Sequence, residues 1–298
     1  MSAVGAEASG QRLLPALFTA SRPLSWINTA FPFAAAYLLT VREIDVALVV
    51  GTLFFLVPYN LAMYGINDVF DFESDARNPR KGGVEGALLP PARHRAVLIA
   101  AVALTVPFVV WLVLLGDPWS WAWLALSLFA VVAYSAPGLR FKEIPGLDSL
   151  TSSTHFVSPA CYGLALAGAT VTPQLVLLLG AFFVWGVASH AFGAVQDVVP
   201  DREAGIGSIA TALGARRTTR LAIGLWLLAG VLMLGTSWPG PLAAVLAVPY
   251  LVAAWPYRSV SDAESARANG GWRWFLAINY GVGFAATMLL IWYALLTA

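Results

Sequence analysis

The segment GTLFFLVPYNLAMYGINDVFDFESDARNPRKGG, Gly51–Gly83, joins one of the most apolar runs of the chain to a cluster of acids and then to a cluster of bases. The run before Asn67 carries no charged side chain as far back as Val46. Charged residues then follow in quick succession, first acidic and then basic. A long apolar run that ends in charge is typical of a membrane helix that reaches the membrane surface.

The composition of the whole chain agrees with a membrane protein. Of its 298 residues, 59% are hydrophobic and only 11% are charged, whereas soluble domains carry about 25% charged residues. No long polar linker divides the chain, so we predict one membrane domain over residues 1–298. The net charge of +1 gives no sign of a nucleic-acid partner. The single Cys161 excludes an internal disulfide and a cysteine metal cluster.

Hydrophobic segments predict the number of membrane crossings. A bilayer core about 30 Å thick needs roughly 20 apolar residues in each crossing helix. Nine segments of this kind lie at about 24–40, 46–66, 96–115, 119–135, 151–168, 174–196, 220–236, 241–257 and 274–296. We therefore predict an all-α integral membrane protein with nine transmembrane helices in one bundle over residues 24–298. Residues 1–23 lack the pattern of a cleaved signal peptide and are predicted to form a short amphipathic surface segment.

The distribution of basic residues predicts the topology. With the N-terminus in the cytoplasm, all but one of the 17 Lys and Arg residues fall on the inner side, the exception being Arg42. Cytoplasmic loops of membrane proteins carry such an excess of positive charge. The pattern predicts a cytoplasmic N-terminus, an outer C-terminus and a cell-membrane location. Among the acids, only Glu43, Asp45 and Asp117 fall on the outer side.

Two acidic clusters lie where a predicted helix reaches the cytoplasm. The first holds Asp68, Asp71, Glu73 and Asp75, and the second, in QDVVPDREAGIGSIATALG, holds Asp197, Asp201 and Glu203. On a helix, the spacing of Asp68, Asp71 and Asp75 puts the three carboxylates on one face, with Asn67 beside them. Asp197 and Asp201 have the same property, although Pro200 is expected to break the helix between them.

Close carboxylates repel one another and require a compensating cation. Carboxylate and carboxamide oxygens suit Mg²⁺, which prefers to share its coordination shell with substrate phosphates. The bases that follow the first cluster can then contact the phosphate oxygens that the metal leaves open. These bases are Arg77, Arg80 and Lys81, and the inner loop YSAPGLRFKEIPGLDSL, which begins at Tyr134, adds Arg140 and Lys142. Two alternatives remain at this point: solvated loop charges, and the cation pathway of a transporter.

Further candidates lie one or two helical turns deeper in the membrane. Asn60 and Tyr64 precede the first acidic cluster at helical spacing, and His190 precedes Asp197 in the same way. His155 is a candidate on the fifth segment. Each histidine is either a hydrogen-bonded core residue or the acceptor of a proton at the end of a reaction. Weaker candidates for the wall of a pocket are Tyr59, Phe156 and Phe192.

The motifs resemble those of the UbiA superfamily of intramembrane prenyltransferases. NDVFDFESD is similar to the NDxxDxxxD motif of that superfamily, DVVPD to its DxxxD motif, and YSAPGLRFK to a loop with a phosphate-binding lysine. Within the superfamily, three further segments most resemble the lycopene elongases of actinobacteria, which make fifty-carbon carotenoids. They are SRPLSWINTAFPFAAAYLL, YNLAMYGINDVFDFESDARNPRKGGVEGALLP and LTSSTHFVSPA.

The resemblance implies dimethylallyl diphosphate as donor, lycopene as acceptor and Mg²⁺ as cofactor. One metal would be held by Asn67, Asp68, Asp71 and Asp75, and a second by Asp197 and Asp201. The bases and Tyr134 named above would bind the diphosphate at the cytoplasmic side, and Asn60, Tyr64, His155 and His190 would contact the reacting groups. Quinone precursors and other lipophilic molecules are acceptors of relatives and remain an alternative here.

Overall fold

The computed structural model describes residues 13–76 and 88–297, whose regular secondary structure is all helical, with no strand. The chain divides into two compact units. Unit 1 comprises the chain up to Arg140 together with His155–Ala169, and unit 2 comprises Phe141–Thr154 together with the chain from Thr170 onward. The all-α prediction is therefore confirmed for the described residues.

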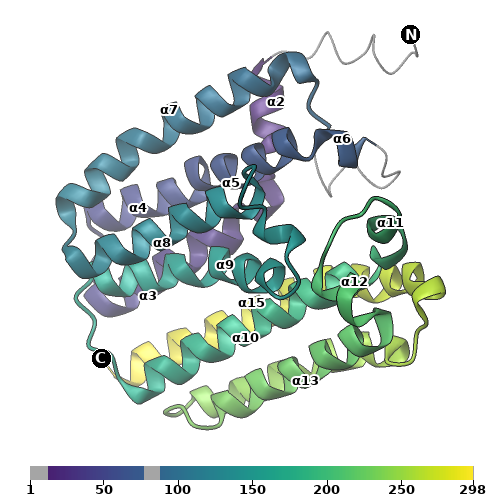
Figure 1. Cartoon of the computed structure of the whole chain (residues 1–298). Helices are drawn as coiled ribbons and strands as arrows, with labels where there is room; N and C mark the ends of the chain where they lie inside the picture. The colour runs from purple at the N-terminus through teal and green to yellow at the C-terminus, as the bar shows by residue number, and fades with distance from the viewer. Residues whose placement is uncertain (1–12, 77–87, 298) are drawn as a thin grey trace. The chain divides into compact units, whose positions relative to one another are not determined.

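Unit 1 is built around α5, which carries the first acidic cluster. Its elements are α2 (Leu13–Ala20), η1 (Pro23–Ser25), α3 (Trp26–Val41), α4 (Val46–Leu56), α5 (Pro58–Phe70), α6 (Phe72–Asp75), α7 (Pro91–Leu115), α8 (Pro118–Ser135) and the later part of α9 (Leu147–Leu166). Helix α5 packs against α7 and α8, as Figure 1 shows for the long helix α7. The core is aromatic: Phe33 lies 5.3 Å from Phe55 and 5.8 Å from Tyr162, measured between ring centroids.

The predicted second helix is broken at Val57, between α4 and α5. Pro58 has no N–H, so the backbone bond that would continue the helix is missing there. The side chain of Asn60 donates to the carbonyl oxygens of Phe55 (2.8 Å) and Leu56 (3.1 Å), and the hydroxyl of Thr29 also donates to Phe55 (2.7 Å). These bonds satisfy the carbonyls at the break. Asn60 is fully buried, and this contact with α3 and α4 fixes the direction of α5.

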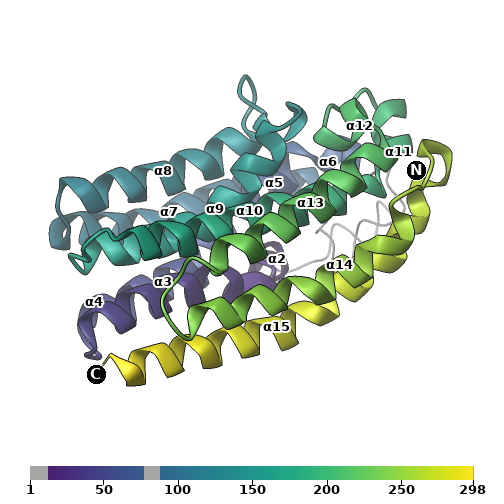
Figure 2. The same cartoon turned by 90° about the horizontal axis from the view of Figure 1, so that it is seen from below.

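Unit 2 is built around α10 and α13, which run side by side in Figure 1. Its elements are η2 (Phe141–Glu143), the first part of α9, α10 (Pro173–Val195), α11 (Val198–Glu203), α12 (Ile209–Leu213), α13 (Ala215–Met233), η3 (Gly240–Ala247), α14 (Val248–Ala254), η4 (Trp255–Tyr257), η5 (Asp262–Ala268) and α15 (Asn269–Leu296). Helices α14 and α15 are also neighbours (Figure 2). Buried Trp226 stacks on Tyr250 and Phe275, at 5.5 and 6.1 Å between ring centroids.

All of the predicted membrane segments coincide with helical structure, but not all of them meet a simple criterion for spanning. Among the described residues, 7 helices are long and apolar enough to cross a membrane. Helix α13 is not among them because Arg216, Arg217 and Arg220 lie in its first turns, and α9 is rich in Ser and Thr. The first candidate span, Leu13–Val41, also begins earlier than the predicted segment because it includes α2.

Helix α2 corresponds to the predicted surface segment. It packs against α5 and α7 with Ala16 and Ala20 buried. Leu14 and Phe18 lie on its exposed side. The helix is thus fixed to the end of α5 that carries the first acidic cluster.

Two of the acids on the predicted outer side cap the N-termini of helices. Asp45 accepts a hydrogen bond from the N–H of Leu48 at the start of α4, and Asp117 accepts one from the N–H of Ser120 at the start of α8. These N–H groups lower the pKa of both carboxyls. Helix capping therefore accounts for both residues.

Candidate active site

The first acidic motif lies at the end of α5. Asp68 and Asp71 are 1% and 8% exposed, so both carboxylates are removed from bulk water. Asp68 is inside the helix, whereas Asp71 follows its last residue and donates its N–H to the carbonyl of Asn67 (2.9 Å). The helical spacing therefore holds from Asn67 to Asp71. Asp75 ends α6, and the predicted phosphate-binding residues Arg77, Arg80 and Lys81 lie outside the described residues.

Arg22 is the basic partner of Asp68. Its Nη2 lies 2.7 Å from Oδ1 of Asp68, and its guanidinium carbon lies 4.2 Å from the ring centroid of Tyr64. The pairing brings the turn between α2 and η1 onto α5. Arg22 is not among the site residues predicted from the sequence, although a signal is present, since it is the only charged residue between Arg12 and Arg42. Tyr64, which is predicted from the sequence to contact the reacting groups, contacts the guanidinium of Arg22 through its ring face.

The loop after α8 reaches the same end of α5. Nη2 of Arg140 lies 3.6 Å from Oδ1 of Asp71, and the hydroxyl of Ser135 donates to Oδ1 of Asn67 (2.9 Å). Arg140 has a left-handed backbone, with φ 42°. Unit 1 thus brings Arg22 close to Asp68 and Arg140 close to Asp71.

A group of polar aromatic residues lies within unit 1. The hydroxyl of Tyr59 lies 3.4 Å from Nδ1 of His155, and the ring of Tyr134 meets the His155 ring edge-on at 5.4 Å between centroids. His155 is 3% exposed. This geometry provides the hydrogen bonding expected of a core histidine and places the His155 ring beside two tyrosines.

The second acidic motif lies in unit 2 and differs from the prediction in one detail. Pro200 does not break the helix between Asp197 and Asp201, because the N–H of Asp201 still donates to the carbonyl of Asp197 (2.9 Å). Pro200 lies in the first turn of α11, where a missing N–H costs no hydrogen bond. The break falls earlier, between the end of α10 at Val195 and the start of α11.

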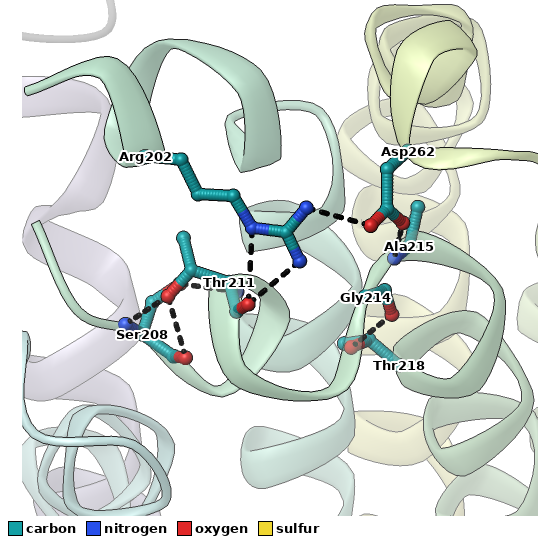
Figure 3. Close-up of polar contacts among 7 residues, drawn as sticks. All are labelled: Arg202, Ser208, Thr211, Gly214, Ala215, Thr218 and Asp262. Carbon is teal, nitrogen blue, oxygen red and sulfur yellow. Dashed lines mark hydrogen bonds and ion pairs between the residues drawn. The ribbon is translucent and has the colours of Figure 1, made fainter. Parts of the chain in front are cut away.

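A cluster of polar contacts fixes the segment that follows this motif. Figure 3 shows Arg202 donating to Oδ2 of Asp262 (2.7 Å) and to the carbonyl of Thr211 (2.8 Å). The other carboxylate oxygen of Asp262 accepts from the N–H of Ala215 (2.7 Å), at the start of α13. The ion pair is well exposed, at 44% and 41% of the two side chains. An exposed pair of this kind contributes about 0–1 kcal/mol.

The remaining predicted site residues are also in unit 2. Lys142 lies in the short η2 turn. His190 lies on α10, and its Nδ1 is 3.0 Å from the hydroxyl of Ser149 in the first turns of α9. Hydrogen bonding to Ser149 therefore accounts for the position of the His190 ring.

The donor atoms suit Mg²⁺, although the described residues contain no group of three His, Cys, Asp or Glu side chains close enough to hold a metal. Asp68 and Asp71 supply hard carboxylate oxygens, and Asn67 adds an amide oxygen at the same end of α5. Each of the two carboxylates lies near a guanidinium, as expected for carboxylates that are removed from bulk water. These are the ligand types that Mg²⁺ prefers.

Comparisons with known proteins identify the family. A model described as the UbiA prenyltransferase family matches residues 29–279. The C(50) beta-cyclic carotenoids biosynthesis protein LbtBC of Dietzia sp. (strain CQ4) is 56% identical over 94% of this chain, which spans 65% of that relative's length. A lycopene elongase/hydratase of Corynebacterium glutamicum is 52% identical over 92% of this chain and 96% of its own length.

The fold also has a counterpart among solved structures. A UbiA homolog from Archaeoglobus fulgidus, bound to DMAPP and Mg²⁺, superposes with a TM-score of 0.65 at 18% identity. The match covers 89% of this chain and 98% of that one. Together with the family match over most of its length, these findings show that the chain belongs to the UbiA prenyltransferase family.

Proposed function

We propose that the protein transfers dimethylallyl groups from dimethylallyl diphosphate to the ends of lycopene, in a Mg²⁺-dependent reaction that gives fifty-carbon carotenoids. As a UbiA family member it is a prenyltransferase. The assignment of lycopene as the acceptor rests on the 52% identity to a lycopene elongase/hydratase over nearly the full length of both chains. A quinone precursor is the alternative acceptor. A transporter of a cation or phosphate compound is disfavoured by the family.

In this proposal the acidic motifs hold two metal ions at the diphosphate. Asn67, Asp68, Asp71 and Asp75 would hold one Mg²⁺, and Asp197 and Asp201 the other. When bound, the metal supplies positive charge that stabilises the diphosphate as a leaving group. The remaining phosphate oxygens are assigned to Arg77, Arg80, Lys81, Arg140 and Lys142. Arg22 is added to the predicted set, because its guanidinium already contacts Asp68.

The residues deeper in the membrane are assigned to the reacting carbon atoms. Departure of the diphosphate leaves an allylic cation, which aromatic ring faces stabilise by about 0.5–2 kcal/mol. Tyr64 is the best candidate because its ring already contacts a guanidinium. The cation is captured by a terminal double bond of the acceptor, and the proton released afterwards is assigned to His155 or His190. Asn60 supports this arrangement from its buried place at the start of α5.

The absence of charge along two helices favours an uncharged acceptor. No Asp, Glu, Lys or Arg lies between Val46 and Asn67 or between Gln174 and Gln196. An aromatic acid would need a base at that depth to hold its carboxylate, because burying an unpaired charge is costly. Lycopene needs none, and it can enter only from the lipid.

The test supplies the purified protein with dimethylallyl diphosphate, Mg²⁺ and one acceptor at a time, and identifies products by mass. With lycopene we expect products of forty-five and fifty carbons, and with 4-hydroxybenzoate no product. The control omits the diphosphate. Prenylated 4-hydroxybenzoate without any enlarged carotenoid would retain the prenyltransferase and overturn the acceptor.

We further propose nine membrane crossings, with the N-terminus and both acidic motifs at the cytoplasmic side and the C-terminus outside. The support is the basic-residue distribution, in which Arg42 alone falls outside. The test places single cysteines in a Cys161→Ser chain at exposed positions. Leu139→Cys and Ala204→Cys should resist an impermeant thiol reagent added to intact cells, and Thr170→Cys should react. Labelling of Leu139→Cys or Ala204→Cys in intact cells would refute the topology.

A further inference from the structure

Asp148 is a fully buried carboxylate that neither the acidic motifs nor the proposed reaction uses. It is 0% exposed and lies in the first turn of α9. Oδ1 accepts a hydrogen bond from the N–H of Gly146 (2.8 Å), and Oδ2 accepts one from the N–H of Ile209 (2.8 Å). Ile209 is the first residue of α12. The two oxygens therefore join backbone segments that are far apart in the sequence.

A second contact joins the same two segments. A Cβ atom placed on Gly207 would lie 2.3 Å from the carbonyl oxygen of Glu143, so the two backbones meet at a distance that only glycine allows. Glu143 follows Lys142 in η2. On the other side, the N–H of Ile206 donates to the carbonyl of Asp201 (2.8 Å). The contact therefore links the turn that carries Lys142 to the turn that closes the second acidic motif.

We propose that Asp148 is a positioning residue, which keeps Lys142 in register with Asp197 and Asp201 so that all three serve one diphosphate. This inference rests on the proposed diphosphate site. Asp148 acts through the backbone, because a carboxylate would repel the diphosphate and both of its oxygens already accept N–H groups. Its negative charge also lies at the start of α9, where the helix dipole favours it.

The geometry requires a carboxylate at this position. Both oxygens accept, and a buried N–H that loses its acceptor destabilises the contact. In Asp148→Asn the shape is kept, but one side-chain atom becomes an NH₂ group that faces a backbone N–H. One of the two segments must then be released. Asp148→Asn therefore alters the hydrogen bonds that hold the two turns together, while it leaves the volume of the side chain unchanged.

The experiment measures equilibrium binding of dimethylallyl diphosphate to the full chain in detergent, at a series of Mg²⁺ concentrations and without acceptor. Asp148→Asn is expected to raise the Kd at least about tenfold at a temperature where the variant remains folded. Asp117→Asn is the matched control, because it also alters a carboxylate that accepts an N–H at a helix start. Its Kd should stay within about twofold of the native value.

Two more variants make the outcome decisive. Gly207→Ala, which forces the same two turns apart without touching Asp148, should raise the Kd in the same direction, and it decides the matter if Asp148→Asn does not fold. In a Lys142→Ala background, Asp148→Asn should raise the Kd by a much smaller factor than it does in the native chain, because the position of the lysine side chain no longer affects binding. A lower melting temperature with native Kd and native Mg²⁺ dependence would show a purely structural role and overturn the inference.

The binding assay also separates this inference from the proposed function. If the native chain binds no dimethylallyl diphosphate with Mg²⁺, the proposed function fails and the positioning role fails with it. If the native chain binds the diphosphate and Asp148→Asn and Gly207→Ala bind it equally well, only the positioning role is lost. The identity of the acceptor does not enter, since none is present.

Discussion

Asp71→Asn and Asp197→Asn are each expected to lower turnover at least about 100-fold while leaving the protein folded in the membrane. The amide keeps the shape of the side chain but removes the charge that a metal ligand needs. Asp71 and Asp197 come from different units, so the two variants test the two acidic motifs independently. Losing a metal ligand costs several kcal/mol of transition-state stabilisation, which is the origin of the expected factor.

The measurement is product formation by purified variants at saturating Mg²⁺. Asp45→Asn serves as the control, because it removes a helix-capping charge on the predicted outer side and should keep nearly native turnover. A chelator in excess should abolish the activity of the native chain. Native-like turnover in either motif variant would remove that residue from the metal-binding set, and full activity in chelator would end the metal hypothesis.

The helices and the helical spacing of Asp68 and Asp71 could be predicted from the sequence, because both depend on local patterns. A long apolar run requires a helix in lipid, and Asp68 and Asp71 are separated by a spacing that a helix brings to one face. Asn60 and Pro58 show the limit of such reasoning. The proline indicates a break in the helix, but only the packing of α3 against α4 shows that Asn60 and Thr29 satisfy the carbonyls there.

The residues that the sequence analysis missed act through tertiary pairing. Asp68 pairs with a residue 46 positions away, Arg22, and the positive-inside pattern made that residue look like ordinary flanking charge. Asp148 pairs with a backbone N–H 61 positions away. Arg22 and Asp148 are both isolated charges in long apolar regions. Arg22 is the only charged residue between Arg12 and Arg42, and Asp148 is the only one between Glu143 and Asp197. Isolation of this kind is a usable signal, but it does not name the partner.

Arg22→Met is expected to destabilise the protein by about 3 kcal/mol or more, because it removes the guanidinium that lies 2.7 Å from the buried carboxylate of Asp68. The Asp68 side chain is 0% exposed and the Arg22 side chain only 19%, so water can replace only a small part of the interaction with the guanidinium. Methionine retains most of the length and apolar surface of arginine, which limits the loss of packing. The expected cost is therefore mainly electrostatic.

Arg267→Met is the matched control, because it removes the same guanidinium from an ion pair between well-exposed side chains, at 3.1 Å from Glu264. That variant should lose no more than about 1 kcal/mol. The free energy of unfolding is measured in mixed micelles for both variants and for Arg22→Met/Asp68→Asn. The double variant should recover much of the stability, because the buried carboxylate that lost its guanidinium is also gone, but it should remain inactive without the Asp68 carboxylate. Equal stability losses in Arg22→Met and Arg267→Met would show that burial does not strengthen the Arg22–Asp68 pair.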